Sequence, residues 1–145
     1  MFNKKVSKIA AKTQVYITKN KNIPASITVD KVKYNYAKLN NIFAYAILNK
    51  DTTVTSKVIT NAPSPTGDKF KTTYKKDEYI DICKKIKAFD KEHGRNPNYI
   101  THNKKKINPL VLVDVLSRII VFADKHNRFP NTADIDTSIL KTLTP

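Results

Sequence analysis

The sequence predicts a helix-dominated α+β fold, built as a tandem repeat array of α-helices joined by short β-hairpins. Three observations lead to this prediction. The segment 89–98 recurs in similar form at 122–131, 33 residues later, and more weakly at 16–24. Ahead of each segment, apolar residues follow the spacing of a helix with one buried face, and short alternating stretches follow it. Self-similarity at a period of 20–50 residues is typical of repeat architectures.

Four helices are expected, and they share one register. Their apolar residues follow an i, i+3, i+4, i+7 pattern. The apolar stripes begin at Val6, Leu39, Tyr79 and Leu112 and end at Tyr16, Asn49, Phe89 and Phe122. Successive stripes are therefore 33, 40 and 33 residues apart, and the longer middle interval implies an insertion of 7 residues. We place this insertion at about 61–67, the segment richest in Pro, Gly and Ser.

Small hairpins are expected between the helices. Residues 27–34 and 99–107 each contain two short alternating stretches joined by a two-residue turn that opens with Asp30 or Asn103. The second unit is degenerate, with a strand expected at 58–60 and a return strand that ends at Tyr74.

Special residues mark the expected helix ends. Asn35 and Asn108 stand at N-cap positions, and Pro109 occupies the first helical position, where its missing N–H has no consequence. Gly94 is expected directly after a helix. A proline, which stops a helix from continuing, follows three of the helices at a constant distance: Pro24, Pro97 and Pro130.

We therefore divide the chain into four units: 6–38, 39–78, 79–111 and 112–145. Each contains a helix, a turn and a small hairpin, and each helix closes one unit and opens the next. One such unit cannot bury its own apolar face, so neighbouring units are expected to stack. The fourth unit has no helix after it.

The chain is strongly basic. Its formal net charge is +15, from 27 Lys and Arg against 12 Asp and Glu. This charge favours an anionic partner, either nucleic acid, an acidic membrane or an acidic polymer. No stretch of 18 apolar residues is present, and the first residues lack the continuous apolar core of a signal peptide. The single Cys excludes an internal disulfide framework and a Cys-rich zinc site, and the 2 Gly exclude a Gly-rich phosphate loop.

No catalytic constellation, metal site or cofactor is expected. Cys83 lies on the apolar stripe, so we predict a buried and unreactive thiol. His93 and His126 occupy equivalent positions at helix ends, where the helix dipole accounts for them without a metal. His102, the third histidine, is not expected to complete a metal site. Paired carboxylates and a Ser/His/Asp set at useful spacing are also missing.

Residues that follow the helices, or lie on the hairpins, are the candidates for ligand binding. They are Arg95, Asn98, Tyr99, Lys104, Lys105, Lys106, Arg128 and Asn131. The recurring arginines and asparagines would contact ligand, or would satisfy carbonyl groups at the helix ends. The lysines at the hairpin tip would form an anion-binding patch, or a solvated turn that protects a strand edge. The tyrosine would stack on sugar rings, or fill space between hairpin and helix.

The repeated segments resemble the pseudomurein-binding repeat of methanogenic archaea and their viruses. The resemblance is carried by Phe89, Arg95, 97–101, Lys106, Ile107 and the helix after Pro109, and less fully by 23–29 and 129–131. It is good over units three and one, partial over unit four and poor over unit two. It implies binding to pseudomurein, the archaeal wall polymer whose glycan carries uronic acid and whose peptides carry Glu and Lys.

Two kinds of protein carry such repeats: large secreted surface proteins, and lytic pseudomurein endoisopeptidases with a Cys-His-Asp peptidase domain after the repeats. An array of four that begins with Met and lacks a signal peptide resembles the lytic enzyme, with the peptidase expected after Pro145. The resemblance therefore implies a monomeric, non-catalytic module that targets a cysteine peptidase to the wall, released by lysis or carried on a virion. The alternatives are a surface adhesin and a nucleic-acid-binding module. The sequence contains no helix-turn-helix, zinc-ligand or ribonucleoprotein motif that would indicate nucleic-acid binding.

Overall fold

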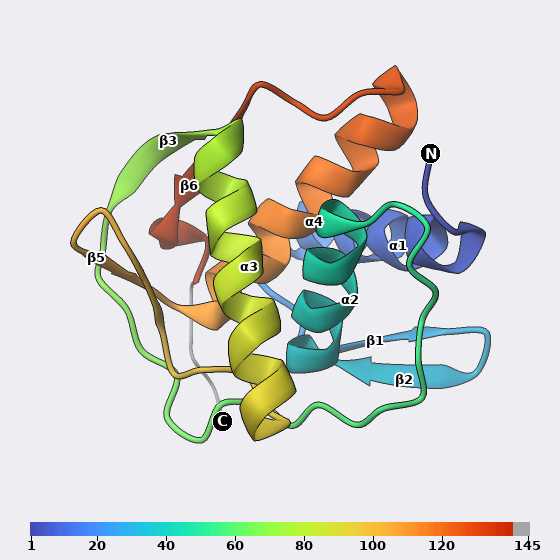
Figure 1. Ribbon diagram of the computed structural model, residues 1–145, viewed down its shortest axis with the longest axis horizontal. Helices are drawn as coiled ribbons and strands as arrows, with labels where there is room; N and C mark the ends of the chain where they lie inside the picture. Colours follow the sequence, from blue (N-terminus) through green and yellow to red (C-terminus); the bar gives the residue numbers. More distant parts are fainter. Residues whose placement is uncertain (141–145) are drawn as a thin grey trace.

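The computed structural model is a mixed α/β fold and describes residues 1–140 (Figure 1). Its helices are α1 (Lys4–Asn20), α2 (Tyr36–Leu48), α3 (Lys76–His93) and α4 (Pro109–His126), with a short 3-10 turn, η1 (Thr137–Ile139), near the end. Its strands are β1 (Ser26–Val29), β2 (Val32–Asn35), β3 (Lys71–Lys75), β4 (Ile100–His102), β5 (Lys105–Ile107) and β6 (Thr132–Asp136). The end of the expected fourth unit, 141–145, lies outside the described residues. Within the described part of the chain, no helix is long and apolar enough to cross a membrane.

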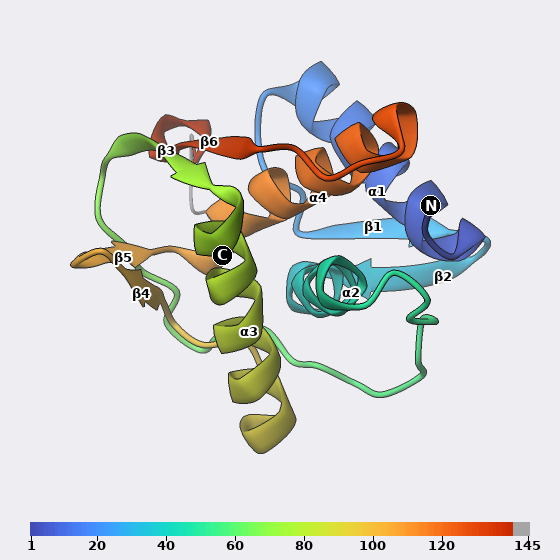
Figure 2. The same ribbon diagram turned by 45° about the horizontal axis from the view of Figure 1, so that its top comes forward.

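The four expected helices form, but they pack as a bundle and do not follow one another in a line. α1 lies against α4, and α2 packs against both α3 and α4 (Figure 2). In an open array each unit contacts only its neighbours along the chain, so the first helix would not meet the last. Here buried apolar residues from all four helices belong to one continuous core.

The apolar stripes supply this core, with a correction at their ends. The last stripe residues were expected to face the core, yet Tyr16 is 38% exposed and Phe89 and Phe122 are only partly buried. The fourth, Asn49, lies after the end of α2. The buried residue comes one position later, at Ile17, Asp90 and Ala123. The reason is geometric: ten residues past the first stripe position fall roughly 80° from its direction, whereas eleven return to within roughly 20°.

The hairpins expected after α1 and α3 both form. β1 pairs with β2 and β4 pairs with β5, each antiparallel and each through a two-residue turn. The turn residues Asp30, Lys31, Asn103 and Lys104 all have positive φ, between 47° and 67°. This is the backbone of a type I′ turn, and it explains why Asn or Asp opens each one.

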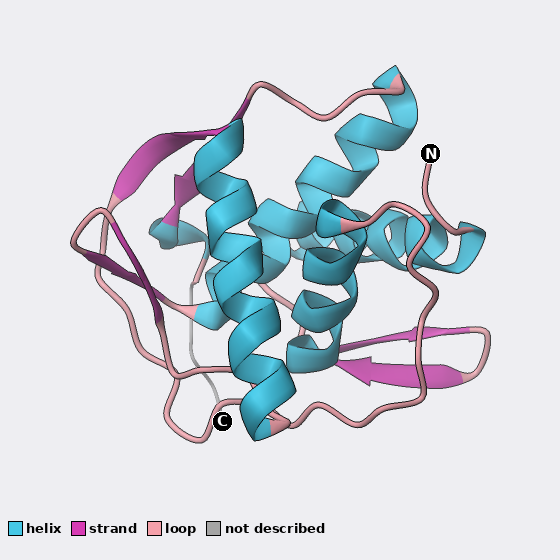
Figure 3. Ribbon diagram, viewed as in Figure 1, coloured by secondary structure: helices cyan, strands magenta, loops and turns pink. Residues whose placement is uncertain are grey.

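The hairpin expected in the second unit does not form. Thr60 instead makes an isolated parallel bridge with Arg95. The expected return strand exists as β3, but its partner is β6, which comes after α4 (Figure 3). The Pro-rich segment before β3 separates it from 58–60, and β6 has no following strand of its own among the described residues. Pairing β3 with β6 supplies hydrogen-bond partners for the main-chain groups along one edge of each strand. β1 and β4 obtain such partners from the next strand of their own hairpin.

The helix ends largely follow the sequence signals. Gly94 ends α3 with φ of +67°, and Pro109 is the first residue of α4. The Asn108 side chain caps α4, accepting from the Leu110 N–H at 2.9 Å. Asn35 occupies the N-cap position of α2 but makes no capping bond, and its Nδ2 donates to the Ile59 carbonyl. The Ala37 N–H at the start of α2 donates instead to Asn61 Oδ1 at 3.3 Å.

Candidate functional site

The same contact between a basic side chain and a strand recurs beside three helices. In each case a Lys or Arg in the middle of the helix donates to a main-chain carbonyl of the strand that follows. The pairs are Lys12 with Thr28 O, Lys85 with Thr101 O at 2.7 Å, and Arg118 with Asp134 O at 2.5 Å. These residues are related by the 73- and 33-residue offsets of the sequence. The contact ties each strand to its helix in the same way, so the segments between helix and strand are comparable.

A cluster of three side chains, here called the α3 stack, lies at the end of α3. It consists of Phe89, His93 and Arg95. The Phe89 and His93 ring centroids are 4.3 Å apart, and the guanidinium carbon of Arg95 is 4.9 Å from the Phe89 centroid. Arg95 Nη1 also donates to the main-chain carbonyl of Asn96 at 3.0 Å. The ring and the carbonyl together hold the guanidinium in place.

The same cluster recurs at the end of α4, as the α4 stack of Phe122, His126 and Arg128. The ring centroids of Phe122 and His126 are 4.2 Å apart, and the guanidinium carbon of Arg128 is 5.1 Å from the Phe122 centroid. Arg128 Nη1 donates to the carbonyl of Phe129 at 3.3 Å. The two stacks are thus equivalent in residue types and in geometry.

Both stacks present guanidinium groups that no carboxylate neutralises within residues 1–140. Arg128 is exposed and Arg95 is partly buried. Each arginine donates one N–H to a main-chain carbonyl, so the other N–H groups of its guanidinium remain for a ligand. In the α3 stack the Glu92 carboxylate lies 3.9 Å from His93 Nε2. A guanidinium held in this way matches the bidentate geometry of a carboxylate or phosphate.

The first two helices carry no such stack. The residues equivalent to the α3 stack in α1 are Tyr16, Asn20 and Asn22. There Asn20 Nδ2 donates to the Tyr16 carbonyl, so the position caps the helix and holds no cation.

The hairpin candidates lie on β4–β5, close to the α3 stack in sequence. Tyr99 is 40% exposed, and the Lys106 ammonium lies 4.9 Å from its ring centroid. Lys105 lies 5.9 Å from the ring of Phe70, and Lys104 is exposed in the turn. These lysines therefore form an exposed cationic edge, two of them resting on aromatic rings.

Asn98 has a structural role. Its Oδ1 accepts from the Ser64 N–H at 2.9 Å, and its main-chain carbonyl accepts from the Thr66 N–H at 2.9 Å. These bonds lay the inserted segment along the β4–β5 hairpin. Asn131 is exposed, and its carbonyl accepts from the Lys76 N–H, which joins the start of α3 to the end of the segment after α4.

The predicted residues do not converge on one site. Arg95, Tyr99 and the three lysines follow α3, whereas Arg128 and Asn131 follow α4. The final turns of α3 and α4 lie at opposite ends of the molecule, at the bottom and the top of Figure 1. The candidate site is therefore two separated clusters of similar chemistry.

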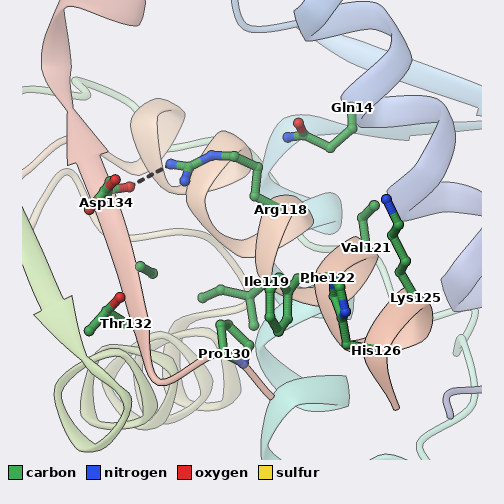
Figure 4. Close-up of a pocket in the computed structure, with 11 residues that line it drawn as sticks. Gln14, Arg118, Ile119, Val121, Phe122, Lys125, His126, Pro130, Thr132 and Asp134 are labelled. Carbon is green, nitrogen blue, oxygen red and sulfur yellow. Dashed lines mark hydrogen bonds between the residues drawn. The ribbon is translucent and has the colours of Figure 1, made fainter. Parts of the chain in front are cut away.

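A groove that we did not predict lies beside the α4 stack (Figure 4). It has a volume of about 390 Å³ and is bounded by α4, β6 and the middle of α1. The sequence carried a signal for it: Ala133 and Thr132 are small where the equivalent residues after α3 are Ile100 and Tyr99.

A buried polar cluster between α2 and α3 was also missed. Asp90, fully buried, accepts from Asn41 Nδ2 at 3.0 Å and from Asn96 Nδ2 at 3.0 Å. Burial raises the pKa of Asp90 to about 6, against the hydrogen bonds and the nearby charges of Lys57 and Lys38. Because these partners come from α2 and from the segment after α3, the cluster joins the two helices.

The thiol and the remaining histidine occupy structural positions. Cys83 is fully buried, as expected, and burial raises the pKa of its thiol. His102 Nε2 lies 2.9 Å from Glu78 Oε2, and its ring packs edge-on against Tyr74. The main-chain N–H of Lys75, together with His102, holds the pKa of Glu78 below its usual value. No group of three His, Cys, Asp or Glu side chains within residues 1–140 is arranged to hold a metal ion.

Comparisons of the chain with protein-family models, curated proteins and solved structures found no match.

Proposed function

We propose that this chain is a non-catalytic module that binds pseudomurein and holds an attached lytic cysteine peptidase, a pseudomurein endoisopeptidase, at its substrate. The observation that supports this most strongly is the duplicated stack. Two arginines, Arg95 and Arg128, are held by the same ring and carbonyl contacts and lack a carboxylate partner within residues 1–140. A carboxylate-bearing polymer would supply that partner at both places.

The charge of the chain favours the same kind of ligand. A formal charge of +15 attracts polyanions over distances of several ångströms and raises their local concentration. Two weak sites on one polymer then gain avidity, because binding at the first raises the effective concentration at the second. The module would act at the archaeal wall, reached by lysis or on a virion. A surface adhesin would use the same contacts.

We also propose that the chain is an array of four repeat units, as divided above, closed into a bundle. Three sets of recurring geometry support this. The contacts of Lys12, Lys85 and Arg118 recur after three helices, two hairpins share one turn type, and the two stacks are equivalent. β3 then serves as the return strand for the unit that begins with α4.

Retention on purified pseudomurein sacculi tests the proposed function. Wild-type protein should be retained at roughly 50 mM salt and released at roughly 500 mM, since salt screens exposed charges. Arg95→Gln with Arg128→Gln should weaken retention by about tenfold or more. Lys33→Gln with Lys84→Gln removes the same charge from exposed lysines without a hydrogen bond or ion pair in the described residues, and should weaken it far less.

Two results would contradict the proposal. Failure of the wild-type protein to bind sacculi at low salt would exclude wall binding. Equal losses in the two double variants would show that net charge, and not the stacks, carries the interaction. A gel shift with duplex and single-stranded DNA over the same salt series addresses the nucleic-acid alternative, which tighter binding to DNA than to sacculi would favour.

A further inference from the structure

The groove beside the α4 stack has an apolar floor and a polar rim. Ile119, Phe122, Pro130 and Ala133 contribute to its floor. Figure 4 shows Arg118 reaching across to the main chain at Asp134 on β6, while Lys125 extends from α4 on the side of α1. Its volume of about 390 Å³ lies within the range of small-ligand sites.

The groove owes its shape and charge to three residues that differ from their equivalents in and after α3. Ala133 and Thr132 replace Ile100 and Tyr99, which removes bulk from the strand side of the groove. Lys125 replaces Glu92, which changes the charge at the helix side from negative to positive. The floor residues Ile119 and Phe122, in contrast, keep the types found in α3, Ile86 and Phe89.

Charge is distributed unevenly along the rim. At one end Arg118 is paired with Asp114 at 3.0 Å, and the Asp134 carboxylate accepts from the Thr73 hydroxyl at 2.6 Å. That end therefore carries two carboxylates against one guanidinium, which favours ligand groups that donate hydrogen bonds and disfavours a second carboxylate. At the other end Lys125 is exposed and has no ion pair within residues 1–140.

We propose that this groove binds one sugar residue that carries a carboxylate. The C–H face of the ring would lie on the apolar floor, its carboxylate would meet Lys125, and its hydroxyls would bond to Thr132 and to the Arg118 and Asp134 end. Charge complementarity favours a ligand with a carboxylate at the Lys125 end and hydroxyl donors at the Asp134 end, which a neutral sugar or an apolar ligand does not provide. This inference rests on the proposed function and names the sugar chemistry that one site would select.

Binding of trigalacturonic acid, a short polyuronate, tests the inference, with maltotriose as a neutral trisaccharide and acetate as a bare carboxylate. Amide NMR signals of β6 and the last turns of α4 should shift with trigalacturonic acid and not with the other two. Thr132→Tyr with Lys125→Glu installs, at these exposed positions, the residues found 33 residues earlier in and after α3, and should weaken binding by about tenfold or more. Lys84→Glu makes the same charge change away from the groove and should change it by less than about twofold.

The inference is overturned if the groove variant binds trigalacturonic acid as the wild type does, if maltotriose binds equally well, or if acetate produces the same shifts. Retention on sacculi separates this failure from failure of the proposed function. Wild-type protein that binds sacculi but not trigalacturonic acid would refute the groove alone. Binding of trigalacturonic acid in the groove without retention on sacculi would refute wall binding and leave the groove chemistry in place.

Discussion

The buried carboxyl of Asp90 should make the stability of this protein depend on pH in an unusual direction. Buried Asp90 sits between α2 and α3 with two amide partners, Asn41 and Asn96. Burial disfavours its charged form more than the amide hydrogen bonds favour it, so its pKa rises from 3.8 to about 6. Most buried carboxyls that are paired with cations shift the other way.

The size and sign of the effect follow from this displacement. A shift of about two pH units corresponds to about 3 kcal/mol. Below pH 4 the carboxyl is protonated in the folded and the unfolded chain, and the full stability is present. Between pH 4 and 6 the unfolded chain releases its proton first, so the free energy of unfolding falls as the pH rises. Above pH 6 both states are ionised and the loss is complete.

Urea unfolding of the wild type and of Asp90→Asn, at several pH values between 4 and 7.5, measures this effect. The amide stays neutral, so the variant should gain about 3 kcal/mol relative to the wild type over this range. Other titrating groups are common to both proteins and cancel in the difference. A difference that stays constant with pH, or that changes in the opposite direction, would show that the amides and nearby lysines outweigh burial.

Three further predictions concern packing. Gly67→Ala should lower the melting temperature, with a loss of about 1–3 kcal/mol, because a Cβ there would lie 2.5 Å from the Asn108 main-chain nitrogen; an unchanged melting temperature would contradict this contact. Tyr79→Phe removes the bond from the Tyr79 hydroxyl to the Pro130 carbonyl at 2.5 Å and should cost about 1–2 kcal/mol in urea unfolding; wild-type stability would show that the bond contributes nothing. Cys83, buried in the core, should react with Ellman's reagent only after denaturation; rapid labelling of the native protein would refute its burial.

Elements determined by neighbouring residues could be predicted from the sequence. The spacing of apolar residues located all four helices, and the Asp30 and Asn103 turns located two hairpins. Both signals are contained within a few residues of the chain. The pairing of β3 with β6 joins segments about 60 residues apart, and no local pattern specifies which distant strand completes a sheet.

The candidate site was predicted only in part, for a related reason. The recurring Phe, His and Arg were visible in the sequence, but Phe89 and Phe122 were assigned to the core face of their helices. Their position at the edge of that face lets each contact an Arg that follows the helix. Asp90 was missed because its buried position holds Ile17 or Ala123 in other units, and its amide partner Asn41 comes from a different helix.

The β3–β6 pairing also fixes how far apart the two stacks lie. It places the start of α3 beside the segment that follows Arg128, where the Lys76 N–H donates to the Asn131 carbonyl. α3 then runs for 18 residues and ends at His93 of its own stack, a rise of roughly 27 Å. A small carboxylate can therefore occupy one stack at a time, and only a ligand long enough to cover this distance can gain avidity from both. The strand that departs from the predicted hairpin pattern is thus the one that gives the two arginines a defined spacing, and a spacing of this size favours a polymer over a small molecule.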